Sequence, residues 1–243
     1  MSAPSTDAPD KSLFARAVGV ITSPGSTFQT IVRFPRPASI LLLVCLVIGL
    51  ATGLPQFTAR GQQMALDTQV QQIERFTGQA VTPEMYTAME GRARYGGYTA
   101  ILGVLIVLPI VCLLISAVLW VIFNTIMGGT GTFKQVLAVV THSQVIGALG
   151  AALGAPIQYM QGVQTMAGPF NLGAVAPMLE PGTLPANVLG ALNIFGIWQT
   201  IVAAIGLAVL YRRKTTPIAI GLLVVYVGLM GLVTLFFSSF GGR

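Results

Sequence analysis

Residues 98–127 read YTAILGVLIVLPIVCLLISAVLWVIFNTIM and contain no Asp, Glu, Lys or Arg. A helix needs about 20 predominantly apolar residues to cross the hydrocarbon core of a bilayer. This stretch exceeds that length, so it predicts a transmembrane helix.

Four further apolar stretches without charged residues lie at 38–57, 135–159, 187–211 and 217–239. The composition of the chain agrees with them, because 54% of its residues are hydrophobic and only 8% are charged. A soluble domain carries about 25% charged residues. We therefore expect an all-α polytopic membrane protein with five transmembrane helices, N-terminal interfacial amphipathic helices and a helical outer loop.

The chain before the first span divides into two parts. Residues 1–11 are rich in Ser, Ala, Pro and Asp, which is typical of a disordered segment, and residues 12–240 form a single membrane domain. A signal peptide is not expected, because the first apolar run starts near residue 38 and is as long as a full span.

Residues 12–34 show helical spacing of apolar side chains, and Ser23-Pro24 is typical of the start of a second short helix. The basic residues Arg16, Arg33 and Arg36 accompany this stretch. A basic amphipathic stretch of this kind is expected to lie in the plane of the membrane surface. Two interpretations stay open: the helices pack on the bundle before the first span, or the three arginines meet anionic lipid or a cytoplasmic protein partner.

The predicted loops also differ in character. In the first, 58–97, residues 62–76 predict a polar helix, and Thr82-Pro83 begins another that runs towards the second span, with Gly96-Gly97 as its weak point. The second, 160–186, has no Lys or Arg and is rich in Gly, Pro and Met, so it is interpreted as a lid, a re-entrant loop or a linker.

The distribution of basic residues predicts the orientation of the chain, because short loops rich in Lys and Arg stay in the cytoplasm. With five spans, one side would carry Lys11, Arg16, Arg33, Arg36, Lys134, Arg212, Arg213 and Lys214. The other side would carry Arg60, Arg75, Arg92, Arg94 and Arg243. We expect a cytoplasmic N-terminus and an external C-terminus. The Ala- and Gly-rich composition suggests a bacterial source, hence the inner membrane.

A polar group inside the spans is costly unless it faces protein or water. The one histidine of the chain, His142, lies beside Gln144 in the third span, and Asn193 and Thr200 lie in the fourth. They are interpreted either as hydrogen-bond partners between helices or as a polar bundle centre that lines a ligand site or pore. Small residues spaced four apart, such as Ser143 and Gly147, predict close packing of the third and fourth spans.

Several classes of function are not supported by the residues present. No carboxylate lies inside a span, which argues against a transporter coupled to protons or sodium but not against a neutral pore. Cys45 and Cys112 lack metal-binding spacing, and residues 128–134 lack the phosphate-loop pattern. We find no catalytic set, so no enzyme, metal or cofactor is predicted. The basic charge follows membrane topology and does not indicate nucleic-acid binding.

Three short motifs occur in a fixed order along the chain. They are Ser23-Pro24-Gly25-Ser26-Thr27-Phe28 with Pro35-Arg36-Pro37, Gly131-Thr132-Phe133-Lys134-Gln135, and Asn193-Ile194-Phe195-Gly196-Ile197-Trp198. With these motifs the chain resembles the bacterial branch of the Yip family, named for Ypt-interacting proteins, over residues 12–240. The resemblance implies a bundle of five spans with a cytoplasmic N-terminus. The Asp-Leu-Tyr-Gly-Pro motif of eukaryotic members, which are linked to Rab GTPases, is absent, so that role is not carried over.

Two hypotheses for the function follow from the sequence. The first is a non-enzymatic membrane protein that acts through lipid or protein partners, as in membrane organisation or a trafficking-type adaptor, with Arg16, Arg33 and Arg36 at the interface. The alternative is a small-molecule, lipid or ion transporter or channel that uses His142, Gln144, Asn193 and Thr200.

Overall fold

The computed structural model describes residues 12–165, 168–175, 178–180 and 183–240. The predicted disordered segment 1–11 lies outside these ranges. Within them the chain is built from helices, and the single β-type pairing is an antiparallel bridge between Asn171 and Asn193. The all-α prediction is confirmed.

Five of the helices are long and apolar enough to cross a membrane, as predicted. Two of them are extended by a tighter or wider helical turn, which brings the spans close to the predicted boundaries. They are α3 (Pro37–Gly53) with η1 (Leu54–Phe57), α6 (Gly96–Trp120) with η2 (Val121–Ile126), α7 (Phe133–Gln161), α9 (Ile194–Tyr211) and α10 (Thr215–Phe240).

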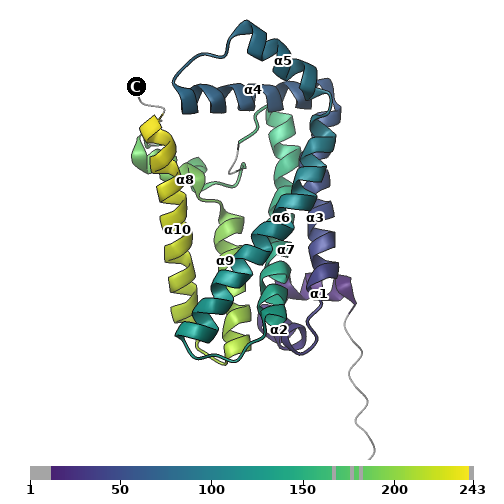
Figure 1. Cartoon of the computed structure of the whole chain (residues 1–243), viewed down its shortest axis with the longest axis vertical. Helices are drawn as coiled ribbons and strands as arrows, with labels where there is room; N and C mark the ends of the chain where they lie inside the picture. The colour runs from purple at the N-terminus through teal and green to yellow at the C-terminus, as the bar shows by residue number, and fades with distance from the viewer. Residues whose placement is uncertain (1–11, 166–167, 176–177, 181–182, 241–243) are drawn as a thin grey trace, which may run out of the picture.

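The bundle is organised around α7, which packs against α3, α6 and α9 (Figure 1). Of its most apolar stretch 61% is buried inside the protein, compared with 28% for both α3 and α9. In contrast, α10 packs on α9, α8 and α4, and only 6% of its most apolar stretch is buried inside the protein, so most residues of that stretch are partly or fully exposed. The predicted centre in the third and fourth spans is therefore α7, with α9 on one side and α3 on the other.

Small residues allow α7 and α9 to approach closely. A Cβ atom at Gly150 of α7 would lie 2.7 Å from Cγ of Phe195 in α9, which is closer than carbon atoms pack. This contact requires glycine, in agreement with the role of small residues at helix interfaces in membranes.

Two short helices precede the first span, α1 (Leu13–Thr22) and α2 (Pro24–Arg33). Pro24 occupies the first turn of α2, as the sequence predicted, and the side chain of Ser12 caps α1. Both helices pack against α7, and α2 also packs against α9. Phe28 and Ile31 are fully buried there, whereas Phe14 is 75% exposed. The pair therefore has one face in the bundle and another outside it.

The opposite end of the bundle is covered by α4 (Ala59–Thr77) and α5 (Pro83–Ala93), the two helices predicted for the first loop (Figure 1). The hydroxyl of Thr82 accepts a hydrogen bond from the backbone N–H of Met85 and so caps α5. Hydrogen bonds from its own backbone N–H and from Thr82 lower the pKa of the Glu84 carboxyl. A turn at Arg94 and Tyr95 separates α5 from α6.

The predicted fourth span, 187–211, is wrong at its start. The helix α8 (Leu184–Ala191) ends, Leu192 and Asn193 are extended, and α9 begins only at Ile194. The break has two causes. The side chain of Asn193 accepts a hydrogen bond from the N–H of Phe195, and Leu192 pairs through its carbonyl with the N–H of Leu172, at 2.8 Å.

The second loop is therefore folded onto the bundle where it is described. The N–H of Ile194 donates to the carbonyl of Phe170, and the rings of Phe170 and Phe195 meet edge to face with centroids 5.1 Å apart. Residues 168–175 are thus anchored at the start of α9, and the interpretation of the loop as a lid, a re-entrant loop or a linker stays a prediction.

Candidate lipid and partner interface

The structure places His142 in the packed interior, with 0% of its side chain exposed. Its Nδ1 atom lies 2.7 Å from the carbonyl oxygen of Ala138. Because a carbonyl only accepts, Nδ1 carries the proton and Nε2 presents a lone pair. That Nε2 has no hydrogen-bond partner in the described chain.

The structure places the residues of the predicted polar bundle centre in different local surroundings. The amide of Gln144 lies 3.7 Å from Sγ of Cys112 in α6, whereas the hydroxyl of Thr200 donates to the carbonyl of Gly196 within its own helix. Asn193 caps α9, seven residues and about 10 Å along the helix axis from Thr200. Within the described part of the chain, no hydrogen bond joins His142, Gln144 and Thr200 to one another. A ligand site or pore lined by the four residues stays a prediction.

Arg16 is not part of an exposed basic surface, which corrects the prediction for this residue. Only 2% of it is exposed, and its Nη1 donates to the carbonyl of Phe34 at 3.0 Å. That carbonyl lies where α2 has just ended, and the last carbonyls of a helix lack intrahelical partners. Arg16 therefore holds the connection between α2 and α3, whereas Arg33 and Arg36 are exposed as predicted.

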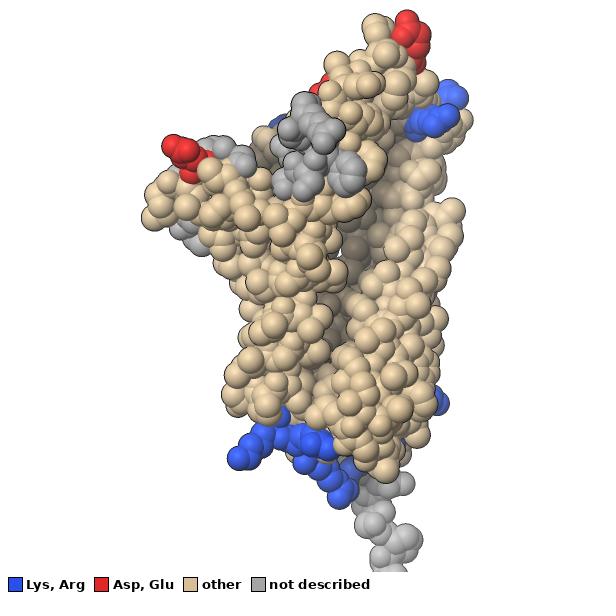
Figure 2. All heavy atoms as spheres, turned by 60° about the vertical axis from the view of Figure 1, so that its left-hand side comes forward, with Lys and Arg blue, Asp and Glu red and all other residues tan. Residues whose placement is uncertain are grey.

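Exposed cations gather at the end of the bundle where α1 and α2 lie, which we call the basic end. Figure 2 shows a cluster of blue side chains at this end, whereas the red side chains lie at the other end together with further blue ones. The described acidic residues lie in α4, in α5 and before α8. The exposed cations of the basic end are Arg33, Arg36, Lys134, Arg212, Arg213 and Lys214.

The turn between α6 and α7 is firmly anchored at the basic end. The indole Nε1 of Trp120 donates to the carbonyl of Gly131 at 3.0 Å, and the hydroxyl of Tyr211 donates to the side chain of Asn124 at 2.8 Å. The guanidinium of Arg213 donates to the carbonyl of Met127 at 2.9 Å. These contacts tie the turn, residues 127–132, to the end of α9.

The motif at the start of α7 has a structural explanation. Thr132 and Gln135 form a capping box, in which each side chain accepts a hydrogen bond from the backbone N–H of the other. The side-chain amide of Gln135 also donates to the carbonyl of Val32 at 3.0 Å. The residues of this motif therefore fix the start of α7 to the turn that precedes it and to α2.

The sequence did not indicate that Trp120, Asn124 and Tyr211 would hold this turn. In the sequence, Arg212 and Arg213 served only to predict the orientation of the chain. Tyr211 and Arg213 bond to partners 87 and 86 residues away, so no local pattern could reveal these two contacts. The bond from Trp120 spans 11 residues, across the turn itself.

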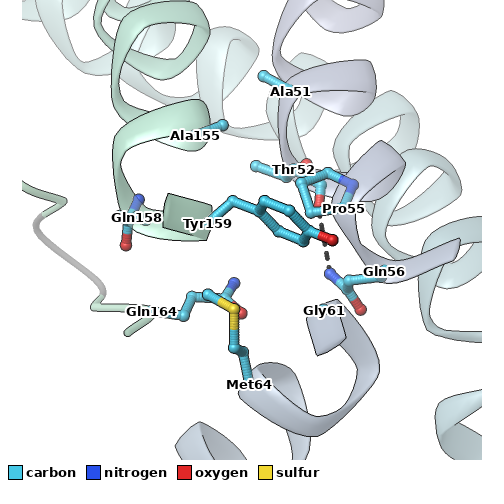
Figure 3. A pocket seen from close by; sticks show the side chains of 10 residues that line it. All are labelled: Ala51, Thr52, Pro55, Gln56, Gly61, Met64, Ala155, Gln158, Tyr159 and Gln164. Carbon is cyan, nitrogen blue, oxygen red and sulfur yellow. Dashed lines mark hydrogen bonds between the residues drawn. The ribbon is translucent and has the colours of Figure 1, made fainter. Parts of the chain in front are cut away.

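At the opposite end a small pocket of about 50 Å³ lies between α3, α4 and α7 (Figure 3). Its lining includes Thr52, Gln56, Gln158 and Tyr159, with no charged side chain, and it has room for only a few water molecules. The hydroxyl groups of Tyr159 and Thr58 share a hydrogen bond of 3.1 Å beside it. The pocket is a gap at the contact between helices rather than a binding site.

The described residues contain no group of three His, Cys, Asp or Glu side chains that could hold a metal ion. Likewise, no hydroxyl or thiol in the described part is hydrogen-bonded to His142. The chemically distinctive surface of the molecule is the basic end.

Five apolar spans around a packed central helix define a polytopic α-helical membrane protein. The Yip1 domain family matches residues 18–237, and the chain belongs to this family, as its motifs predicted. Membrane protein YknW of Bacillus subtilis is 27% identical over 190 residues, which cover 78% of this chain and 75% of that protein. No solved structure matches the chain significantly.

Proposed function

We propose that this protein is a non-enzymatic membrane protein that acts at its basic end, through anionic lipid or a protein partner. The observation that carries the proposal is the combination of exposed cations and exposed apolar side chains at this end. Arg33 and Arg36 are exposed and lie in the sequence on either side of Phe34, which is itself 55% exposed, and Phe14 of α1 is 75% exposed. Such a surface suits a membrane face or a partner helix.

The orientation of the chain is part of the proposal. Short loops rich in Lys and Arg stay in the cytoplasm, so the basic end faces the cytoplasm, and the α4–α5 pair lies outside. The N-terminus is then inside and the C-terminus outside, since the five spans alternate in direction. A bacterial relative named as a membrane protein supports a bacterial membrane, and the proposal places the chain in the inner (plasma) membrane.

The packed interior also supports a role at the surface rather than through the bundle. Thr141, His142 and Ser143 are all buried in α7, and the hydroxyls of Thr141 and Ser143 donate to carbonyls one turn earlier. A bundle packed in this way suits a scaffold that presents the basic end.

The test is the double substitution Arg33→Gln and Arg36→Gln in native membranes, with a photoreactive amino acid in place of Phe34. Each cation near an anionic surface contributes about 1 kcal/mol, so we expect the yield of lipid and protein adducts to fall about tenfold or more. The matched control is Arg92→Gln with Arg94→Gln at the opposite end, which should leave the adducts unchanged. Equal adduct yields in both double variants would refute the proposal.

Transport is a second candidate function, and one observation favours it. His142 Nε2 and Thr27 Oγ1 are buried and have no hydrogen-bond partner in the described chain. Unpaired buried groups are uncommon, and they often mark a functional site or a bound water.

Reconstitution in liposomes separates the two candidates. We expect proton leak, followed with a trapped pH dye, and the flipping of a fluorescent lipid to equal those of empty liposomes. If the native protein supports flux and His142→Ala abolishes it, transport would instead be established, provided that the variant keeps its unfolding temperature.

A further inference from the structure

The basic end is hollowed between α2, the turn at residues 127–132 and the end of α9. The hollow has a volume of about 670 Å³, which falls in the range of small-molecule sites, about 300–1,000 Å³. Its lining is mainly polar, and the side chains and backbone that matter here are Gln29, Arg33, Gly128–Gly131, Tyr211, Arg212 and Arg213.

Three guanidinium groups line the hollow without a carboxylate beside them. Arg33 and Arg212 have no ion pair in the described chain, and Arg213 uses one N–H for the carbonyl of Met127. The described acidic residues lie in α4, in α5 and before α8, at the other end of the molecule. A guanidinium has five donors in a planar fork that matches the oxygens of a phosphate group.

The turn supplies further donors. The backbone N–H groups of Gly128, Thr130 and Gly131 donate to no acceptor in the described chain. Gly128 has a φ of +68°, a conformation that favours glycine, and the turn is held by hydrogen bonds from Trp120 and Arg213. Because these donors are already fixed in place, binding an anion to them costs little conformational entropy.

The surroundings favour a lipid over a soluble phosphate. Exposed apolar residues adjoin the lining elements in the sequence, with Phe34 directly after α2 at 55% exposed and Ile126 before the turn at 74% exposed. The hollow also lies where the spans α6 and α9 end, and lipid headgroups are expected at the ends of membrane spans. A molecule bound here could keep its acyl chains in the bilayer beside α6.

We propose that this hollow binds the phosphate headgroup of an anionic phospholipid, with Arg33, Arg212 and Arg213 and the amides of the 127–132 turn as its donors. The proposal rests on the proposed function, which places the working surface at the basic end, and it names the ligand and the residues that hold it.

The test uses the purified full chain in a neutral detergent, titrated with phosphatidylglycerol, and counts bound lipid by native mass spectrometry. Each arginine contributes about fivefold to affinity near an anionic headgroup, so Arg33→Gln with Arg212→Gln should weaken binding about 25-fold. Both side chains are exposed, and an unchanged unfolding temperature confirms that the variant is folded.

The control removes two charges from the same end but outside the hollow, with Lys134→Gln and Lys214→Gln. It should weaken binding less than about twofold, because these side chains do not line the hollow. Equal losses of lipid affinity in the two double variants would overturn the proposal. They would indicate only a general attraction between the charges of the basic end and anionic lipid.

A second arm separates a lipid from a free phosphate. Inorganic phosphate at millimolar concentration should neither displace phosphatidylglycerol nor raise the unfolding temperature, whereas phosphatidylglycerol should raise it and phosphatidylcholine should not. Protection by inorganic phosphate alone would overturn the assignment to lipid. The lipid titration uses purified protein without a partner, so a negative titration would not contradict the adducts expected at position 34. Conversely, missing adducts at position 34 would not contradict lipid binding in the titration.

Discussion

Replacing Gly206 by leucine is expected to destabilise the bundle by about 3 kcal/mol, the upper range for overpacking a core. Gly206 is buried in α9 at the point where α2 and α7 meet it. A Cβ atom there would lie 2.6 Å from Cγ1 of Val139 in α7 and 3.0 Å from Cδ1 of Phe28 in α2. The larger side chain therefore has to push both helices away from α9.

The measurement is the midpoint of thermal unfolding in detergent, where about 3 kcal/mol corresponds to a drop of roughly 10 °C in a chain of this size. The control is Gly221→Leu on α10, where an added Cβ meets nothing within 4 Å. It makes the same chemical change on a surface left to lipid and should shift the midpoint little. Similar midpoints for the two variants would contradict the packing of α2, α7 and α9 described above.

The spans could be predicted because the length rule for a bilayer is local. Residues 98–127 were identified from the absence of charge alone, and the structure has α6 with its continuation at Gly96–Ile126. The same holds for the start of α5, where the hydroxyl of Thr82 bonds to the N–H of Met85, three residues away.

The start of the fourth span could not be predicted, because its cause is distant in the chain. Hydropathy continues through Leu192 and Asn193, and the break depends on Leu172, twenty residues earlier. Asn193 alone is a weak signal, since asparagine also occurs inside membrane helices as a hydrogen-bond partner.

The candidate site shows the same limit. The exposure of Arg33 and Arg36 agrees with their predicted positions flanking a short amphipathic helix, but Arg16 is buried against the carbonyl of Phe34, eighteen residues away. The hollow joins three segments that are far apart in the sequence, namely α2, the 127–132 turn and the end of α9. Sequence patterns identified its cations, and only the fold shows that they converge.

The second large effect is expected for Phe28→Ala, which removes a fully buried ring from α2. Truncating a buried phenylalanine costs about 3–5 kcal/mol in a packed core. Phe28 lies against Gly206 of α9, so its loss should release α1 and α2 from the bundle before the spans themselves separate. Hydrogen exchange of the backbone amides in residues 12–34 is expected to rise, while exchange within α7 changes little.

The control for this prediction is Phe14→Ala in α1, since that ring is 75% exposed and lies on the uncovered face. It should leave both the unfolding midpoint and the exchange pattern close to those of the native protein. The pair of variants therefore separates the two interpretations of the N-terminal helices. If α1 and α2 only lay on the membrane surface, the two truncations would have similar and small effects. A large effect of Phe28→Ala alone means that the bundle holds the helices in place, and that Arg33 is presented to the hollow by that packing.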